Sequence, residues 1–258
     1  MPLRAIAFDL WETLITETRE RSREQTRLRL TRMESILTAA GFSGAADRIE
    51  HAYRAIWNRL HELYWSEDRD VPCRRQIEHF LEELEIEPHS FDEATLDALE
   101  EAYAHAAVEI PPSAIDGAPE MLRELKTRGY GVGLISNTGR TPGYALRRIL
   151  EQLELAPSID VMVFSNEHGE CKPQASIFEE LRRGLGVRYD EMMFVGDNLY
   201  VDVHGAQRCG MRAVHFEPAV RGSAVALPVD HGLTIVPDAT ISRLAEVLEV
   251  IESLAVSR

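Results

Sequence analysis

The first apolar run of the chain ends at a carboxylate, and this junction constrains both the fold and the chemistry. Residues 3–8, Leu-Arg-Ala-Ile-Ala-Phe, have the length and composition of a short buried strand, and Asp9 follows them directly. A carboxylate at the end of a strand is placed to act as a nucleophile in covalent catalysis. An acid/base enzyme of this kind needs a second Asp two residues later, but that position holds Trp11. The sequence therefore predicts a nucleophile without its usual proton-handling partner.

Three later apolar runs are also followed by polar side chains. These are Ser136 and Asn137 after residues 132–135, Lys172 after residues 159–164, and Asp197 and Asp202 after residues 192–195. Helical patterns alternate with the runs, which predicts an α/β fold with a parallel sheet. In such sheets, ligands bind outside the carboxyl ends of the strands. We therefore expect these side chains and Asp9 to meet at one edge of the sheet.

The residue types suit phosphoryl transfer, which needs a nucleophile, positioning and charge neutralisation. Asp9 would attack phosphorus and form an aspartyl-phosphate. Ser136, Asn137 and Lys172 would bind the phosphoryl oxygens through a hydroxyl, an amide and a fixed positive charge. Asp9, Ser136 and Lys172 are thus the candidate catalytic residues. Carboxylates from Asp9, Asp197 and Asp202 offer the oxygen ligands that Mg²⁺ prefers, so we expect Mg²⁺ as the cofactor.

These four segments, in this order, resemble the four motifs of the haloacid dehalogenase superfamily of hydrolases. The resemblance covers roughly residues 1–14 and 111–216 and includes Gly169-Glu170-Cys171-Lys172-Pro173 around the lysine. It implies that Asp9 is the nucleophile and that Ser136 and Lys172 belong to the second and third motifs. It also implies that the metal ligands are Asp9, Asp197, Asp202 and the backbone carbonyl of Trp11.

The family often inserts a helical cap after the first motif, and the composition changes here after Leu14. Apolar residues recur with helical spacing in four stretches. These contain Leu28 to Leu37, Ala52 to Leu63, Phe80 to Leu84, and Leu96 to Tyr103. We predict a Rossmann-like parallel-sheet core of residues 1–14 and 111–258 and a smaller all-helical cap of residues 15–110. In the core we expect a helix N-cap at Thr141, a loop over residues 217–237, and a last helix from Asp238 or Thr240 to Leu254.

Trp11 leaves three functions open. In the family's phosphatases an Asp at this position protonates the leaving group, whereas its hydrolytic dehalogenases often carry an aromatic residue there. Those dehalogenases, however, typically lack the first acid of the fourth motif, which this chain keeps as Asp197. We therefore expect a magnesium-dependent hydrolase of phosphorylated small molecules. The alternatives are a 2-haloacid dehalogenase-like hydrolase and a non-catalytic phosphometabolite-binding pseudoenzyme.

Two further features narrow the chemistry. The family's phosphonate-cleaving branch uses a cap lysine as a Schiff base, but residues 15–110 contain no lysine, and arginine is no amine nucleophile. Glu12 is a candidate replacement for the missing acid. Strand alternation would point its side chain away from Asp9, so a solvated glutamate is the favoured interpretation.

Composition limits the partners. A net charge of −15 and a pI near 5.1 argue against nucleic acid or an anionic membrane as partner, and we expect a phosphorylated or carboxylated small molecule. No apolar stretch is long enough to span a membrane.

Three cysteines, an odd number, favour reduced thiols in the cytoplasm. The arginines between residues 19 and 32 alternate with glutamates, which favours a solvated helix face over a substrate clamp. The oligomeric state stays open.

Overall fold

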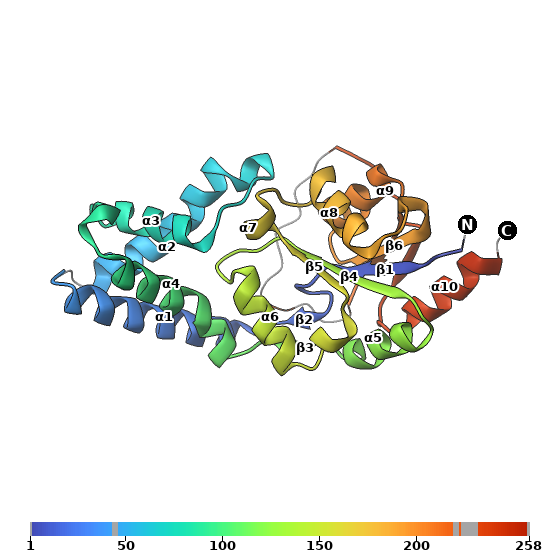
Figure 1. The fold of residues 1–258 in the computed structure, drawn as a ribbon, viewed down its shortest axis with the longest axis horizontal. Coiled ribbons are helices and arrows are strands. Elements are labelled where there is room, and N and C mark those ends of the chain that lie inside the picture. The colour runs from blue at the N-terminus through green and yellow to red at the C-terminus, as the bar shows by residue number, and fades with distance from the viewer. Residues whose placement is uncertain (1, 43–45, 219–221, 223–231, 257–258) are drawn as a thin grey trace.

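A computed structural model describes residues 2–42, 46–218, 222 and 232–256. Its centre is a six-stranded sheet in the order β5-β4-β1-β6-β7-β8, in which every neighbouring pair is parallel (Figure 1). The strands are β1 (Ala5–Phe8), β4 (Gly131–Ser136), β5 (Val161–Phe164), β6 (Met192–Gly196), β7 (Arg212–Phe216) and β8 (Ala239–Ile241). The predicted α/β fold with a parallel sheet is confirmed.

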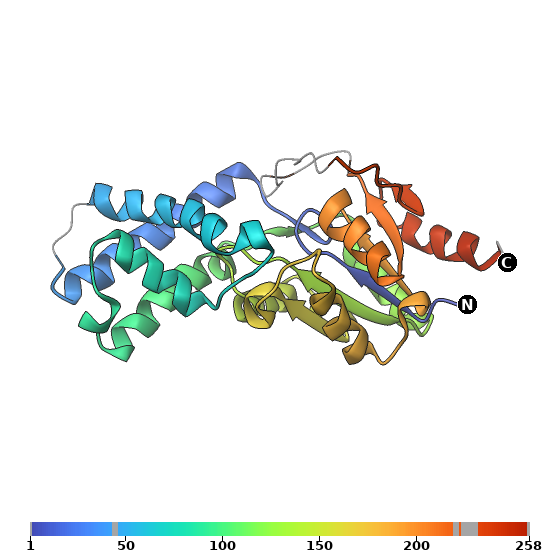
Figure 2. The ribbon, with the colours of Figure 1, turned by 90° about the horizontal axis from the view of Figure 1, so that it is seen from above.

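Helices cover both faces of this sheet (Figures 1 and 2). They are α5 (Ala118–Thr127), α6 (Gly143–Gln152), α7 (Ser165–His168), α8 (Ala175–Leu185), α9 (Gly205–Cys209) and α10 (Glu246–Val256). In β1, Ile6 and Phe8 belong to the apolar cluster that α5, α6 and α10 share, whereas Ala5 and Ala7 belong to the cluster formed with α8 and α9. A strand with both faces covered has no polar side, which explains its unbroken apolar sequence.

Four long helices form a separate apolar cluster at one end of the molecule (Figures 1 and 2). They are α1 (Arg19–Ala39), α2 (Ala46–Leu63), α3 (Cys73–Glu83) and α4 (Glu93–Glu109). The short antiparallel pair β2 (Ile15–Thr16) and β3 (Ser113–Ala114) lies where the chain passes between this bundle and the sheet. Ala145 of α6 belongs to the bundle's cluster, so α6 is a surface on which the bundle packs. We propose that residues 15–110 are the cap, with the boundaries given above.

Shorter helical turns connect these elements. They are η1 (Trp65–Glu67), η2 (Pro88–Ser90), η3 (Ala156–Ser158), η4 (Tyr189–Glu191) and the π-helix η5 (Leu199–His204). In the described part of the chain, no helix is both long and apolar enough to cross a membrane.

The structure corrects two predicted helix starts. Residues 239–241 form β8 beside β7, and α10 begins only at Glu246, because Ala239 and Ile241 pair with the edge of the sheet. The N-cap position of α6 is Pro142 rather than Thr141, and the side chain of Pro142 cannot cap the helix. The N–H of Gly143, the first residue of α6, donates to Asn166 Oδ1 (3.1 Å). Of the predicted loop over 217–237, residues 219–221 and 223–231 lie outside the described residues.

Candidate active site

The register of the sheet brings the ends of three strands together. Phe8 of β1 lies beside Leu134 of β4 on one side and Val195 of β6 on the other. Asp9 continues this pairing, since its N–H donates to the Val195 carbonyl (2.9 Å), and its side chain is largely buried. Ser136, at the end of β4, is fully buried. The predicted meeting of polar residues at the carboxyl edge of the sheet is therefore observed for these segments.

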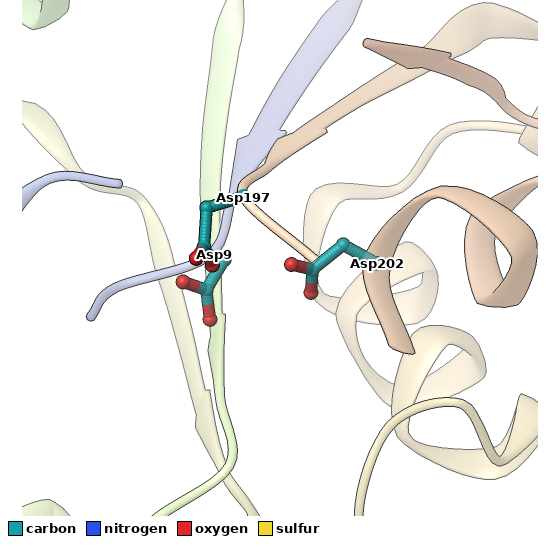
Figure 3. Close-up of side chains that lie close together, drawn as sticks. All are labelled: Asp9, Asp197 and Asp202. Atoms are coloured by element: carbon teal, nitrogen blue, oxygen red, sulfur yellow. The ribbon is translucent and has the colours of Figure 1, made fainter. Parts of the chain in front are cut away.

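Three carboxylates converge at this edge. Asp9, Asp197 and Asp202 each offer an oxygen, and these oxygens lie within 4.8 Å of one another. Figure 3 shows Asp202 reaching from its helix toward Asp9 and Asp197, which follow neighbouring strands. Asp202 Oδ2 accepts a hydrogen bond from the Asn198 N–H (3.0 Å), which fixes its orientation. A set of three carboxylates with only oxygen donors fits a hard cation such as Mg²⁺.

Lys172 lies between two of these acids. Its Nζ donates to Asp9 Oδ1 (2.6 Å), to Asp202 Oδ1 (2.7 Å) and to the Ile135 carbonyl (3.1 Å), and the residue is 1% exposed. Burial opposes the charge on Lys172, but Asp202 and Asp9 outweigh it and raise the pKa of the ammonium above its ordinary value. Burial also raises the pKa of Asp202, to about 6, although Lys172 opposes the rise. Lys172 is thus a fixed cation among carboxylates.

Asn137 has a contact that sequence reasoning missed. Its Nδ2 donates to the Lys172 carbonyl (3.0 Å), and its Oδ1 accepts from the Lys172 N–H (2.7 Å). The pair of bonds joins the loop after β4 to the loop that carries Lys172. Within the described part of the chain, the one hydrogen bond of the adjacent Ser136 hydroxyl is a long contact to the Asn137 carbonyl (3.4 Å). The side chain of Asn137 therefore positions Lys172, and its predicted role in phosphate binding stays a prediction.

Glu12 departs from its favoured interpretation as a solvated residue. It is 2% exposed and has a positive φ of 59°, a conformation that non-glycine residues rarely adopt. Its carboxylate accepts from Thr16 Oγ1 (3.0 Å) and from the Gly222 N–H (2.6 Å). The left-handed turn after β1 directs the side chain inward, where these donors hold it. The expectation failed because strand alternation was applied beyond Phe8, where the strand ends.

The arginines of α1 also differ among themselves. Arg29 is 4% exposed and donates to the Tyr103 carbonyl (2.8 Å), whereas Arg32 forms an exposed ion pair with Glu109. The solvated face predicted for these residues therefore does not include Arg29, which packs between α1 and α4.

Comparison with known proteins identifies the family. A family model of haloacid dehalogenase-like hydrolases matches residues 3–210, which is most of the chain. The chain belongs to the haloacid dehalogenase-like hydrolases. The resemblance read from the four motifs is confirmed.

Individual relatives of this haloacid dehalogenase-like hydrolase are named phosphatases. A glyceraldehyde 3-phosphate phosphatase from Pyrococcus furiosus is 33% identical over 138 residues, which cover 54% of each chain. A ribulose-1,5-bisphosphate 5-phosphatase from Halopiger xanaduensis is 32% identical over 57% of this chain and 59% of its own. The chain thus spans little more than half the length of these curated relatives.

Solved structures share the fold of this haloacid dehalogenase-like hydrolase over nearly its whole length. A 2-haloacid dehalogenase from Pseudomonas syringae pv. Tomato superposes with a TM-score of 0.67 at 21% identity and covers 98% of this chain and 99% of its own. A phosphatase of the same family from Thermococcus onnurineus gives a TM-score of 0.59 at 20% identity and covers 96% and 98% of the two chains. At these identities the likeness concerns the fold alone.

Gly196 tests whether the close packing of Asp202 matters. A Cβ added at this glycine would collide with the carboxyl group of Asp202, so Gly196→Ala must displace that side chain. We expect the variant to lose at least about tenfold in apparent Mg²⁺ affinity, as when a group that positions a metal ligand is removed, measured by titration calorimetry. Gly131→Ala is the matched control, because its added Cβ would meet atoms only at 3.5 Å or beyond. Unchanged Mg²⁺ binding in Gly196→Ala would contradict the assignment of Asp202 as a ligand.

Proposed function

We propose that the protein is a magnesium-dependent hydrolase of phosphorylated small molecules that acts through an aspartyl-phosphate on Asp9. The single observation that carries the proposal is the convergence of Asp9, Asp197 and Asp202, with the buried Lys172 in contact with Asp9 and Asp202. The phosphatase names of the relatives support the substrate class. We further propose that the protein acts in the cytoplasm, as its three free cysteines suggest, and on small molecules rather than on nucleic acid, as its acidic composition suggests.

The reaction would proceed in two displacements. An oxygen of the Asp9 carboxylate attacks phosphorus, so the Asp9 O–P bond forms while the bond from phosphorus to the leaving oxygen breaks. Water then attacks the aspartyl-phosphate, which releases inorganic phosphate and restores the carboxylate. Lys172 holds Asp9 by the hydrogen bond of 2.6 Å and offers positive charge for the phosphoryl oxygens. Among the described residues, the Ser136 hydroxyl makes a long contact to the Asn137 carbonyl (3.4 Å), and it can turn to donate to the same oxygens.

Mg²⁺ would be held by Asp9, Asp197, Asp202 and the backbone carbonyl of Trp11. The three carboxylates fit the ion because they converge and are all oxygen donors. When bound, the ion supplies neutralisation of phosphoryl charge. Two side chains position the nucleophile: Lys172 orients Asp9, and Asn137 holds the backbone of Lys172 by two hydrogen bonds.

Turnover of p-nitrophenyl phosphate with Mg²⁺ and with EDTA tests this function. The p-nitrophenolate leaving group needs no proton, so the absence of an Asp at position 11 does not hide a working nucleophile. We expect release in Mg²⁺, loss of release in EDTA, and recovery when Mg²⁺ is restored. No release under any of these conditions would remove the proposed function.

Trp11 predicts a strong dependence on the leaving group. Without a carboxylic acid at this position, the leaving oxygen must depart unprotonated, so aryl and acyl phosphates should react faster than alkyl phosphates. We expect a difference of at least about 100-fold, the usual contribution of general acid catalysis. The measurement is kcat/KM for p-nitrophenyl phosphate against glycerol 3-phosphate. Trp11→Asp should narrow the gap, and equal rates in the unsubstituted protein would contradict the prediction.

A 2-haloacid dehalogenase is the second candidate, because an aromatic residue at position 11 also suits a leaving group that needs no proton. Asp9 would then displace halide from carbon, and the ester would be hydrolysed by water. Halide release from 2-chloropropionate that persists in EDTA would favour this candidate. A pseudoenzyme would instead bind phosphorylated ligands, seen as a rise in Tm, and release neither phosphate nor halide.

A further inference from the structure

Four consecutive residues after Asn137 each contact a different part of the cap. Thr138 Oγ1 donates to Asp70 (2.9 Å), and the Gly139 carbonyl accepts from Gln76 of α3 (3.1 Å). Arg140 donates to the Tyr53 carbonyl of α2 (3.0 Å). Thr141 Oγ1 accepts from Arg29 of α1 (3.4 Å). The cap is therefore fastened to the segment that directly follows Ser136 and Asn137. We call residues 138–141 the docking segment.

Asp70 joins cap and core through its two carboxylate oxygens. It lies between η1 and α3 and is 5% exposed. Its Oδ1 accepts from Trp65 Nε1 (3.0 Å) and the Val71 N–H (2.8 Å), which both belong to the cap. Its Oδ2 accepts from Thr138 Oγ1 (2.9 Å) and Ser165 Oγ (2.5 Å), which both belong to the core. One carboxylate thus ties together the docking segment, the start of α7 and the cap.

The burial of Asp70 makes these four hydrogen bonds necessary. Burial raises the pKa of the carboxyl group, and the donors from Ser165, Trp65, Val71 and Thr138 oppose the rise. A buried carboxylate is stable only when its oxygens are hydrogen-bonded, and removing it leaves its former donors unsatisfied. The position therefore demands an acceptor with two oxygens.

The backbone around Asp70 also holds the loop that carries Lys172. The Asp70 N–H donates to the Gly169 carbonyl (2.9 Å), and the Cys171 N–H donates to the Asp68 carbonyl (2.7 Å). Cys171 directly precedes Lys172, whose Nζ contacts Asp9. The two loops that Asn137 links from within the core are thus linked a second time, from the cap.

We propose that Asp70 is a positioning residue, which couples the placement of the cap to the segments that carry Ser136 and Lys172. This inference rests on the proposed function for its catalytic consequence, although the coupling itself can be measured without turnover. Asp70 makes no contact with the carboxylates of the site among the hydrogen bonds of the described residues. Its effect on catalysis must therefore pass through the two loops.

Asp70→Asn tests the proposal with little change in volume. The amide retains one acceptor for Trp65 and Val71 but presents an N–H₂ group to the Thr138 and Ser165 hydroxyls. We expect kcat for p-nitrophenyl phosphate to fall about 10- to 100-fold, the effect of losing hydrogen bonds to a charged group, with a smaller change in KM. Thr138→Val, which removes one hydroxyl donor and keeps the shape, should act in the same direction if the Asn variant does not fold.

Amide hydrogen exchange provides the readout that does not need turnover. Peptides covering residues 137–141 and 169–172 should exchange about tenfold faster in Asp70→Asn than in the unsubstituted protein, because local opening becomes easier. All comparisons are made well below the Tm of each variant. A double-mutant cycle of Asp70→Asn with Thr138→Val should show non-additive effects, as expected for partners in direct contact.

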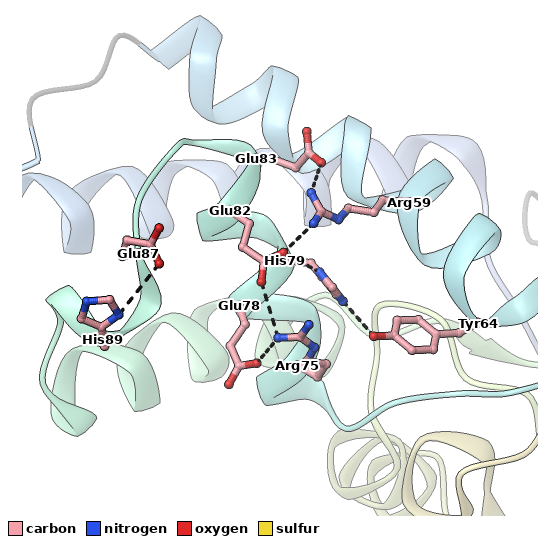
Figure 4. A network of polar contacts seen from close by, with 9 residues as sticks. All are labelled: Arg59, Tyr64, Arg75, Glu78, His79, Glu82, Glu83, Glu87 and His89. Carbon is pink, nitrogen blue, oxygen red and sulfur yellow. Dashed lines mark hydrogen bonds and ion pairs between the residues drawn. The ribbon is translucent and has the colours of Figure 1, made fainter.

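Glu82→Gln is the matched control. Glu82 of α3 accepts from Arg59 of α2 (2.6 Å) and contacts His79 Nδ1 (2.9 Å), in a polar network that joins the two cap helices (Figure 4). The same change from carboxylate to amide therefore weakens the cap internally, away from the docking segment. We expect a lower Tm with kcat and exchange at residues 137–141 and 169–172 unchanged.

The outcomes separate the coupling from the proposed function. Unchanged hydrogen exchange in both segments of Asp70→Asn would overturn the coupling. A loss of turnover no larger than the fraction of the variant that is unfolded would also overturn it. Equal exchange effects in Glu82→Gln would also overturn it, because any weakening of the cap would then suffice. If the unsubstituted protein hydrolysed no phosphate ester, the proposed function would fail, and the exchange comparison would still decide the coupling.

Discussion

Asp9→Asn is expected to abolish turnover of p-nitrophenyl phosphate, with a loss of at least about 10,000-fold, as for removal of other catalytic nucleophiles. The amide is a poor nucleophile and cannot form the aspartyl-phosphate. The fold should persist, because the Asp9 N–H still donates to the Val195 carbonyl and Lys172 keeps its ion pair with Asp202. Steady-state rates with Mg²⁺ and a thermal melt of each protein provide the measurement.

Asp160→Asn is the control for this substitution. Asp160 directly precedes β5, so it lies at the amino ends of the parallel strands, whereas Asp9 lies at their carboxyl ends. There Asp160 pairs with Lys126 and accepts from the Val132 N–H (2.8 Å). We expect the turnover of Asp160→Asn to stay within a factor of about two of the unsubstituted protein, since surface substitutions away from a site have small effects on the fold. Residual activity above about one per cent in Asp9→Asn would exclude Asp9 as the nucleophile.

Local sequence patterns were sufficient for the parallel strands of the site. The apolar runs before Asp9, Ser136 and Asp197 are β1, β4 and β6, and parallel pairing then requires their polar ends to share one edge. The helical stripes of the cap were also predicted, because buried residues recur with the period of a helix, as at Met33 and Leu37 of α1.

Features that depend on contacts between distant segments escaped prediction. β8 is only three residues long, and its pairing with β7 rather than its composition makes it a strand. The bonds from Asn137 to Lys172 join residues 35 positions apart, which no local pattern encodes. The inward turn of Glu12 follows from its positive φ, which a search for alternation does not reveal. Asn137 itself signals only that its side chain can bind backbone groups in a loop, and it does not identify Lys172 as the partner.

The comparison of solved structures limits what fold alone decides about function. Dehalogenases and phosphatases superpose on this chain over nearly its whole length. The distinction therefore depends on individual residues, since a common fold supports different chemistries. Here Trp11 suits dehalogenation, or phosphoryl transfer from a leaving group that needs no proton, whereas the convergence of Asp197 and Asp202 with Asp9 favours the metal-dependent reaction.

Lys172→Met is expected to lower the free energy of unfolding by about 3–5 kcal/mol in EDTA, because it leaves buried carboxylates without their counter-charge. Asp202 is 1% exposed, and both Asp202 and Asp9 lose their hydrogen bonds to Nζ. Turnover should be lost as well, since Lys172 holds Asp9, the proposed nucleophile. Urea denaturation of the metal-free protein measures the stability.

Two controls give this result its interpretation. Lys126→Met removes the other lysine of the chain, whose ion pair with Asp160 is partly exposed, and should cost less than about 1 kcal/mol. The double variant Lys172→Met with Asp202→Asn should recover part of the stability, because one of the uncompensated charges is gone. If the double variant were less stable than Lys172→Met alone, charge repulsion between buried carboxylates would not be the cause. If the double variant recovers stability but has no turnover, the buried charges of Lys172 and Asp202 serve the reaction rather than the stability of the fold.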